Sequence, residues 1–423
     1  MLQVDLYTRD FPTVFARFRE AVGERQWTKR VTAINSEARG QPYLREYLLK
    51  ENAIAFALDR CSAQASRHGA FPSQSSNDRS LYPAFRLAAQ TLSLIDKSSA
   101  KQGKRLVRRI HGAFRNPDDM RAIQLEFGIA THFVRRGYRI SWPEMEESGD
   151  FDLMVHGIGP DGLEVECKSA SVDKGRKIHK RDALDFNHLV RQKLEGTAHR
   201  LNSGLAVVLT VSDRLPAAFR DRQQLAERVV RAVLVGKSIT VDEGSDVRLS
   251  EFDIVQYPDL GAPESSQLRQ YIDHITGTRN REAMILGRKG AGALVFVTQS
   301  RQEDTFLRYV FNSVREAARE QLSAKRAGIV LVGLEGISAD ELVRTAQQDK
   351  NPTEDPTALR IAVSKFLGGS TTDHVVGVGF LSKDELTPKG PGHVSSEGSA
   401  YHFPKTESSF WHDDFSGMFG KTG

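Results

Sequence analysis

The segment Leu163–Ser169 constrains the fold of this chain more than any other part of the sequence. Its odd-numbered positions up to Cys167 are apolar, while its even-numbered positions carry Glu164, Glu166 and Lys168. Successive side chains of a strand point to opposite faces. The pattern therefore predicts a β-strand with one face in a core, and with an acid and a lysine side by side on the other face.

A second strand is expected just upstream, at Phe151–His156. The sequence between the two strands contains Pro160–Gly162, which reads Pro-Asp-Gly and is a strong turn signal. The two strands are therefore predicted to form a hairpin. In such a hairpin Asp152 lies opposite or diagonal to Glu166, so that two carboxylates and one ammonium group meet at one place.

A third carboxylate is expected from the helix that precedes this hairpin. The Asn-Pro pair at Asn116 is a good helix start, and the helix should run to about Arg136 and stop at Gly137. Glu126 lies midway along this helix in an otherwise apolar stripe, where a bare charge is costly without a partner. The alternative is an ordinary glutamate on the helix surface.

These residue types together suit metal-assisted hydrolysis of a phosphodiester. Carboxylates hold Mg²⁺ or Mn²⁺, the metal polarises the phosphoryl oxygen, and a lysine offsets charge in the transition state. Glu166-Cys167-Lys168 is the only acid-x-Lys triplet in the sequence. The alternative is a surface hairpin in which Glu166 and Lys168 are exposed and make an ordinary cross-strand pair.

The order of these elements resembles the PD-(D/E)xK nuclease superfamily, which includes type II restriction endonucleases and Holliday-junction resolvases. A helix with an internal glutamate precedes three strands, and a long helix (183–201) and a fourth strand (205–211) follow them. The resemblance covers about residues 115–212. It implies a restriction-endonuclease-like core, in which helices flank a mixed sheet, and it implies DNA as the substrate.

Carried over to this sequence, the resemblance implies a site residue at each of four positions. Asp152 and Glu166 would be metal ligands, Glu126 the helix carboxylate and a further ligand, and Lys168 the catalytic lysine. The proline expected before the first aspartate is absent, which leaves Asp150 as a weaker candidate for that position.

Two basic runs are candidates for contacts with phosphate groups. One run, from Lys101 to Arg115, has six Lys/Arg and no acid. The other follows the third strand and leads into the helix expected beside the site, so we expect it to contact the nucleic acid. It consists of Lys174, Arg176, Lys177, Lys180 and Arg181. The alternative for either run is a solvated helix face or a loop.

The chain has 423 residues, which is too long for one ordinary core. The sequence predicts a helical N-terminal region (1–110), a nuclease core (111–262) and a C-terminal α/β region (263–423). The fold class is therefore expected to be α/β, with a restriction-endonuclease-like core flanked by these two regions.

The sequence also bears on the surroundings of the protein. The sequence has only two cysteines, and they form no C-x-x-C pair. Its N-terminus is charged, and it has no apolar run of about 20 residues. We therefore expect a cytoplasmic protein rather than a membrane protein. No helicase or methyltransferase motif is visible, so partner proteins of a multi-component system are expected to supply recognition or translocation. A homo-oligomer is the alternative partner. The resemblance suggests restriction or antiphage defence as the setting. An RNA-directed nuclease, and a nucleic-acid-binding or assembly protein with a nuclease-like fold, remain the alternatives.

Overall fold

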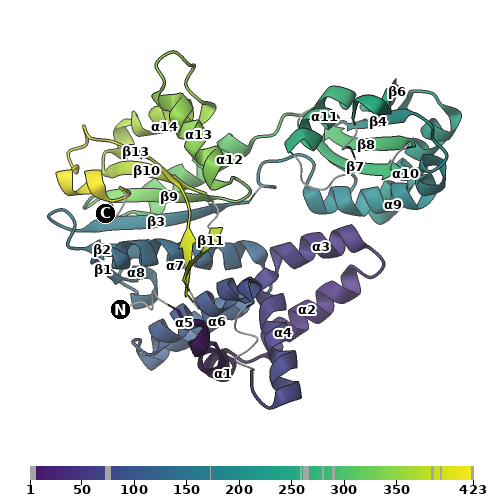
Figure 1. Ribbon diagram of the computed structural model, residues 1–423. Coiled ribbons are helices and arrows are strands. Elements are labelled where there is room, and N and C mark those ends of the chain that lie inside the picture. The colour runs from purple at the N-terminus through teal and green to yellow at the C-terminus, as the bar shows by residue number, and fades with distance from the viewer. Residues whose placement is uncertain are drawn as a thin grey trace. The chain divides into compact units, whose positions relative to one another are not determined.

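The computed structural model describes residues 6–71, 78–171, 173–257, 260, 266–278, 281–287, 291–382, 385–390 and 393–420. It is a mixed α/β protein that divides into two compact units (Figure 1). Unit 1 consists of Met1–Arg39, Leu48–Val172 and Leu307–Gly423, and unit 2 of Gly40–Tyr47 and Asp173–Phe306. In the described part of the chain, no helix combines the length and the apolar character that a membrane crossing requires.

The N-terminal part of the chain is helical, as predicted. Phe11, Phe15 and Phe18 recur at helical spacing and are buried in the core of unit 1. The helices of this part are α1 (Phe11–Val22), α2 (Arg25–Glu37), α3 (Pro42–Glu51), α4 (Ala53–His68), α5 (Tyr82–Ile95) and α6 (Ala100–Ala113). Except for α3, they share one hydrophobic core with the sheet of unit 1, so residues 1–110 are not a separate domain.

Unit 1 contains a six-stranded sheet in the order β1-β2-β3-β9-β10-β13. Its strands are β1 (Arg139–Ser141), β2 (Leu153–His156), β3 (Leu163–Ala170), β9 (Gly328–Leu334), β10 (Val375–Leu381) and β13 (Ala400–Pro404). The predicted hairpin is confirmed, because β2 and β3 pair antiparallel with Leu153 opposite Val165. On its other side β3 pairs parallel with β9, and Val165 lies opposite Ile329.

Helices cover both faces of this sheet (Figure 1). The helix α7 (Pro117–Arg135) packs against the face of Val165 and Cys167, where its Phe127 is buried. It begins at the capping side chain of Asn116 and ends before Gly137, whose φ is 87°, so the predicted helix is confirmed. The opposite face is covered by α12 (Phe306–Glu316) and α14 (Ala358–Leu367), with α13 (Ala339–Lys350) beside β13.

Unit 2 is a second α/β layer structure. Its five-stranded sheet has the order β5-β6-β4-β8-β7. The strands are β4 (Gly204–Val211), β5 (Ile239–Asp242), β6 (Ser245–Phe252), β7 (Arg281–Gly287) and β8 (Ala293–Ser300). One face packs against α9 (Lys180–Ala198) and α10 (Phe219–Val235), and the other against α11 (Ser266–Thr276).

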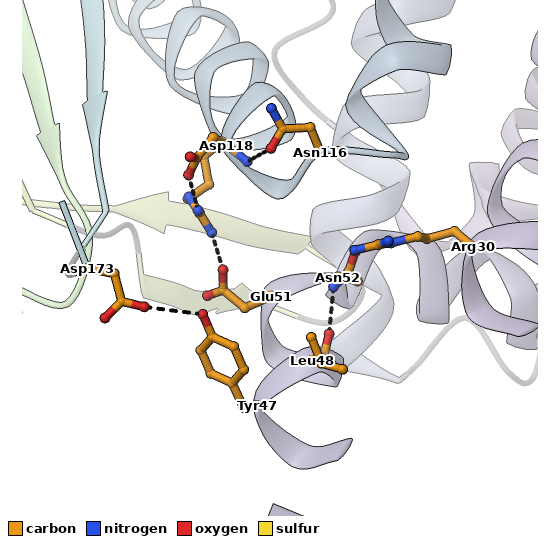
Figure 2. Close-up of polar contacts among 9 residues, drawn as sticks. Arg30, Tyr47, Leu48, Glu51, Asn52, Asn116, Asp118 and Asp173 are labelled. Carbon is orange, nitrogen blue, oxygen red and sulfur yellow. Dashed lines mark hydrogen bonds and ion pairs between the residues drawn. The ribbon is translucent and has the colours of Figure 1, made fainter. Parts of the chain in front are cut away.

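Polar side chains of α3 form hydrogen bonds within each unit (Figure 2). In unit 1, Arg121 of α7 donates to Glu51 (2.8 Å) and also pairs with Asp118. In unit 2, Tyr47 donates to Asp173 at 3.4 Å. Glu51 and Asp118 are thus joined through one guanidinium group, which ties the last residue of α3 to the first turn of α7.

The expectation that residues 183–201 and 205–211 complete the sheet of the candidate site is wrong. These residues form α9 and β4, and β4 pairs with β6 and β8 in the sheet of unit 2. The helix and strand that follow β3 in its own sheet are α12 and β9. The three consecutive regions predicted (1–110, 111–262 and 263–423) also differ from the two units observed, because the larger part of unit 2, Asp173–Phe306, is inserted after β3. Apolar periodicity identifies a strand but not its partner.

Phe127 tests the packing of α7 on the sheet. Its side chain is 2% exposed and meets Trp142 edge to face. Replacing Phe127 with alanine should lower the free energy of unfolding by about 3–5 kcal/mol, because it leaves a cavity between helix and sheet. Urea denaturation measures this loss. Phe219→Ala, at a position 64% exposed, is the matched control, and an equal loss there would contradict the assignment.

Candidate active site

The hairpin of β2 and β3 places the first two candidate carboxylates together. Asp152 lies one residue before β2, and the β2–β3 register, continued by one residue, sets it opposite Glu166. The backbone N–H of Cys167 donates to Asp152 Oδ2 at 2.8 Å. This hydrogen bond fixes the aspartate against β3, as the hairpin prediction required.

The buried Glu166 and the half-buried Lys168 form an ion pair on the face of β3 opposite Val165 and Cys167. The Lys168 Nζ lies 2.9 Å from Glu166 Oε1, and Glu166 is only 2% exposed. The same ammonium group donates to Gln321 Oε1 at 2.6 Å. Gln321 ends a π-helical turn (η5, Ala317–Gln321) that follows α12, and such turns occur often at functional sites. The lysine is therefore held from two elements of unit 1.

Glu126 is the third carboxylate, and it is a buried residue of α7 rather than a surface one. It is 2% exposed and pairs with Arg109 of α6. The other end of the Arg109 guanidinium lies 3.8 Å from Glu144, in the short helix α8 (Pro143–Glu146). The costly charge within the apolar stripe of α7 thus has its partner, which the sequence pattern did not identify.

The three carboxylates affect one another electrostatically. Burial, and after it the negative charge of Asp152, raises the pKa of Glu126 and of Glu166 to about 8. Burial also raises the pKa of Asp152, against the opposing effects of the Cys167 N–H and of Arg109. Because the ionised forms of these neighbouring acids are destabilised, a positive charge placed among them would be favoured.

The arrangement fits a divalent cation on the evidence of its unused oxygens. Among the described residues, Glu126 Oε2 and Glu166 Oε2 are both buried and neither has a hydrogen-bond partner. Carboxylate oxygens of this kind are the ligands that Mg²⁺ and Mn²⁺ prefer. No group of three or more His, Cys, Asp or Glu side chains in the described ranges is already gathered as a metal site. Lys168 and Arg109 hold the other oxygens of the two glutamates.

Two neighbouring acids have different surroundings. Glu164 is buried on the same face of β3 as Glu166, but it accepts hydrogen bonds from the Ser323 backbone (2.7 Å) and hydroxyl, and lies 3.3 Å from Arg326. It therefore fixes the segment after η5. Asp150, the weaker candidate for the aspartate of the site, is exposed. The geometry favours Asp152 over Asp150.

The second basic run lies in unit 2, whereas the carboxylates lie in unit 1. Within unit 2, Arg176 pairs with Glu282 (2.6 Å) and Asp304 (3.6 Å), and Lys177 pairs with Asp213 (2.7 Å). Lys180 is the first residue of α9. The nucleic-acid contact assigned to Lys174, Arg176, Lys177, Lys180 and Arg181 stays a prediction, and acidic partners already hold Arg176 and Lys177.

Sequence reasoning missed Arg109 and Gln321. Arg109 belongs to the first basic run, where the sequence shows only a stretch of cations without acids. Nothing in that stretch pointed to Glu126 as its partner. Gln321 stands far beyond β3 in the chain and reaches Lys168 only because β9 and β3 are neighbours. Neither contact follows from spacing in the sequence.

Comparisons with known proteins add no identification to this geometry. No protein-family model, no curated protein and no solved structure matches the chain. The candidate site is therefore judged on its own residues.

The raised pKa values predict how stability depends on pH. A carboxyl group whose pKa is about 8 in the folded protein and about 4.3 in the unfolded chain favours folding most below pH 4.3, and loses this contribution as pH rises toward 8. The melting temperature of the metal-free protein should therefore fall between pH 5 and pH 8, apart from the effects of other groups.

Glu166→Gln provides the matched measurement, because the amide cannot ionise. In EDTA the melting temperature of this variant should fall less between pH 5 and pH 8 than that of the parent. At pH 8, added Mg²⁺ should raise the melting temperature of the parent more than that of the variant. Parallel pH profiles for parent and variant would contradict the coupling of Glu166 to its neighbours.

Proposed function

We propose that this protein is a metal-dependent nuclease that hydrolyses phosphodiester bonds of DNA. The observation that carries the proposal is the convergence of Asp152, Glu166 and Lys168 on the β2–β3 hairpin, with the buried Glu126 of α7 near enough for its charge to affect theirs. Three carboxylates and one ammonium group are the set that metal-assisted phosphodiester hydrolysis needs. The site's two buried oxygens without hydrogen-bond partners support a cation as the missing partner.

The arrangement of elements supports the same proposal. In unit 1 the order is α7, three strands, α12 and then β9, with β9 parallel to β3. This order resembles the core of the PD-(D/E)xK nucleases, with unit 2 as an insertion after the third strand. The resemblance favours DNA over RNA and suggests a restriction-endonuclease-like fold.

Each residue has a distinct role in the proposed reaction. Asp152, Glu166 and Glu126 would hold Mg²⁺ or Mn²⁺, which polarises the phosphoryl oxygen and makes water a better nucleophile. Lys168, fixed by Glu166 and Gln321, orients the attacking water and offsets negative charge that builds on the phosphate. Arg109 keeps the Glu126 carboxylate in place from outside the cluster.

A cleavage assay tests this function directly. The protein is incubated with supercoiled plasmid, linear DNA or RNA, in Mg²⁺ or in EDTA. We expect DNA to be cut with Mg²⁺ alone, and Asp152→Ala and Lys168→Ala to lose at least about 100-fold in rate, because each removes a group that stabilises the transition state. Asp150→Asn is the control and should cut like the parent, since Asp150 is exposed.

The other functions give different results in the same assay. Cutting of RNA but not DNA would indicate an RNA-directed nuclease. Binding of nucleic acid without any cutting would indicate a binding or assembly protein. If the Asp152→Ala and Lys168→Ala variants cut as fast as the parent, the assignment of the site is wrong.

A further inference from the structure

The helix α6 presents one strongly cationic face. It carries five Lys/Arg and no acid. At 3.6 residues per turn these five side chains fall within an arc of about 140°. The opposite side of the helix is buried in the core of unit 1 through Leu106, Ile110 and Ala113. The cations are thus gathered on the outer side of a helix whose inner side is fixed.

One row of this face ends at the candidate active site. Lys101, Arg105 and Arg109 follow one another at four-residue intervals, so the row extends for about 12 Å along the helix. Its last member, Arg109, pairs with the site carboxylate Glu126. Lys104 and Arg108 lie beside the row, and no acid among the described residues pairs with either of them.

A short acidic segment lies against this row of cations. Glu147, which directly follows α8, is 2.9 Å from the Lys101 ammonium group and 3.3 Å from the Arg105 guanidinium. Glu144 of α8 is 3.8 Å from Arg109. Each cation of the row therefore meets a carboxylate oxygen from the same few residues. Pairs exposed to this degree contribute little to stability, so other anions can replace them.

We propose that Lys101, Arg105 and Arg109 bind the sugar–phosphate backbone of DNA and lead it to the carboxylates, and that Glu144 and Glu147 occupy these cations when DNA is absent. The inference rests on the proposed function, because it names the surface by which that substrate reaches the site. Lys104 and Arg108 add charge beside the track.

The dimensions and the chemistry of the row suit a nucleic-acid strand. The phosphates of a nucleic-acid strand are regularly spaced, so three cations spread over about 12 Å of helix can each contact a phosphate group. Arginine binds phosphate oxygens through two parallel N–H groups. Glu144 and Glu147 present carboxylate oxygens where phosphate oxygens would lie. Removing their charge should therefore favour DNA, and removing the cations should oppose it.

Binding measured without cutting separates this inference from the nuclease proposal. The full-length protein in EDTA is titrated into a fluorescently labelled DNA duplex, and the dissociation constant is followed by anisotropy over a range of salt concentrations. The variant Lys101→Ala/Arg105→Ala should bind about 10-fold more weakly, with a salt dependence shallower by about two units of slope, since two phosphate contacts are lost. Glu147→Gln should bind about 3-fold more tightly.

A second exposed ion pair provides the control. Lys193 and Glu227, 3.1 Å apart in unit 2, have exposures of 41% and 48%. Lys193→Ala removes one positive charge, as each substitution of the double variant does, and Glu227→Gln changes the net charge as Glu147→Gln does. Both controls should leave the affinity within about 2-fold of the parent. Circular dichroism confirms that each variant is folded.

The unaltered protein gives an independent measurement that no folding defect can disturb. Lysines are acetylated with and without the DNA duplex and quantified by mass spectrometry. DNA should protect Lys101 and Lys104 several-fold while Lys193 reacts as before. Equal reactivity of Lys101 with and without DNA would overturn the inference.

The outcomes of the binding assay are equally distinct. Unchanged affinity in Lys101→Ala/Arg105→Ala, or weaker binding in Glu147→Gln, overturns the inference even if the protein cuts DNA. Opposite shifts in these two variants support it. If those shifts occur and no cleavage is found with Mg²⁺, the nuclease proposal fails while the binding track stands.

Discussion

The burial of three carboxylates at one end of a hairpin is the constraint on which the candidate site depends. Asp152, Glu166 and Glu126 raise the cost of one another's charges, and each would be expensive in a core without a partner. The protein supplies only part of the compensation, through Lys168 and Arg109. The remaining demand for positive charge is the feature on which the proposal of a divalent cation rests.

Supplying these cations requires elements that are far apart in the chain. Lys168 comes from β3, Arg109 from α6, and the side chain that steadies the lysine, Gln321, from the turn after α12. The larger part of unit 2 is inserted after β3. The insertion separates β3 and β9 in the chain, but the two strands remain neighbours in one sheet. The residues around the site therefore belong to one packed unit.

Much of the local structure followed from the sequence. The strand alternation at Glu166 and Lys168, the turn after β2 and the capped helix that carries Glu126 all depend on neighbours within a few residues. The helix α9 and strand β4 were also expected as elements, but they were assigned to the wrong sheet. Strand propensity does not distinguish among the several strands with which an apolar strand could pair. Only the packing of the whole chain selects the partner.

By itself, the sequence determined which residue types stand at which intervals. That was enough to bring Asp152, Glu166 and Lys168 together, since a hairpin is a local structure whose register follows from alternation and a turn. The tertiary structure alone decided that Arg109 compensates Glu126 and that Gln321 holds Lys168. It also decided that Glu144 of α8 and Glu147 after it lie on the cations of α6. Such contacts join segments that are far apart in the chain. Core packing decides which of these segments lie close together in space, and the sequence separation does not.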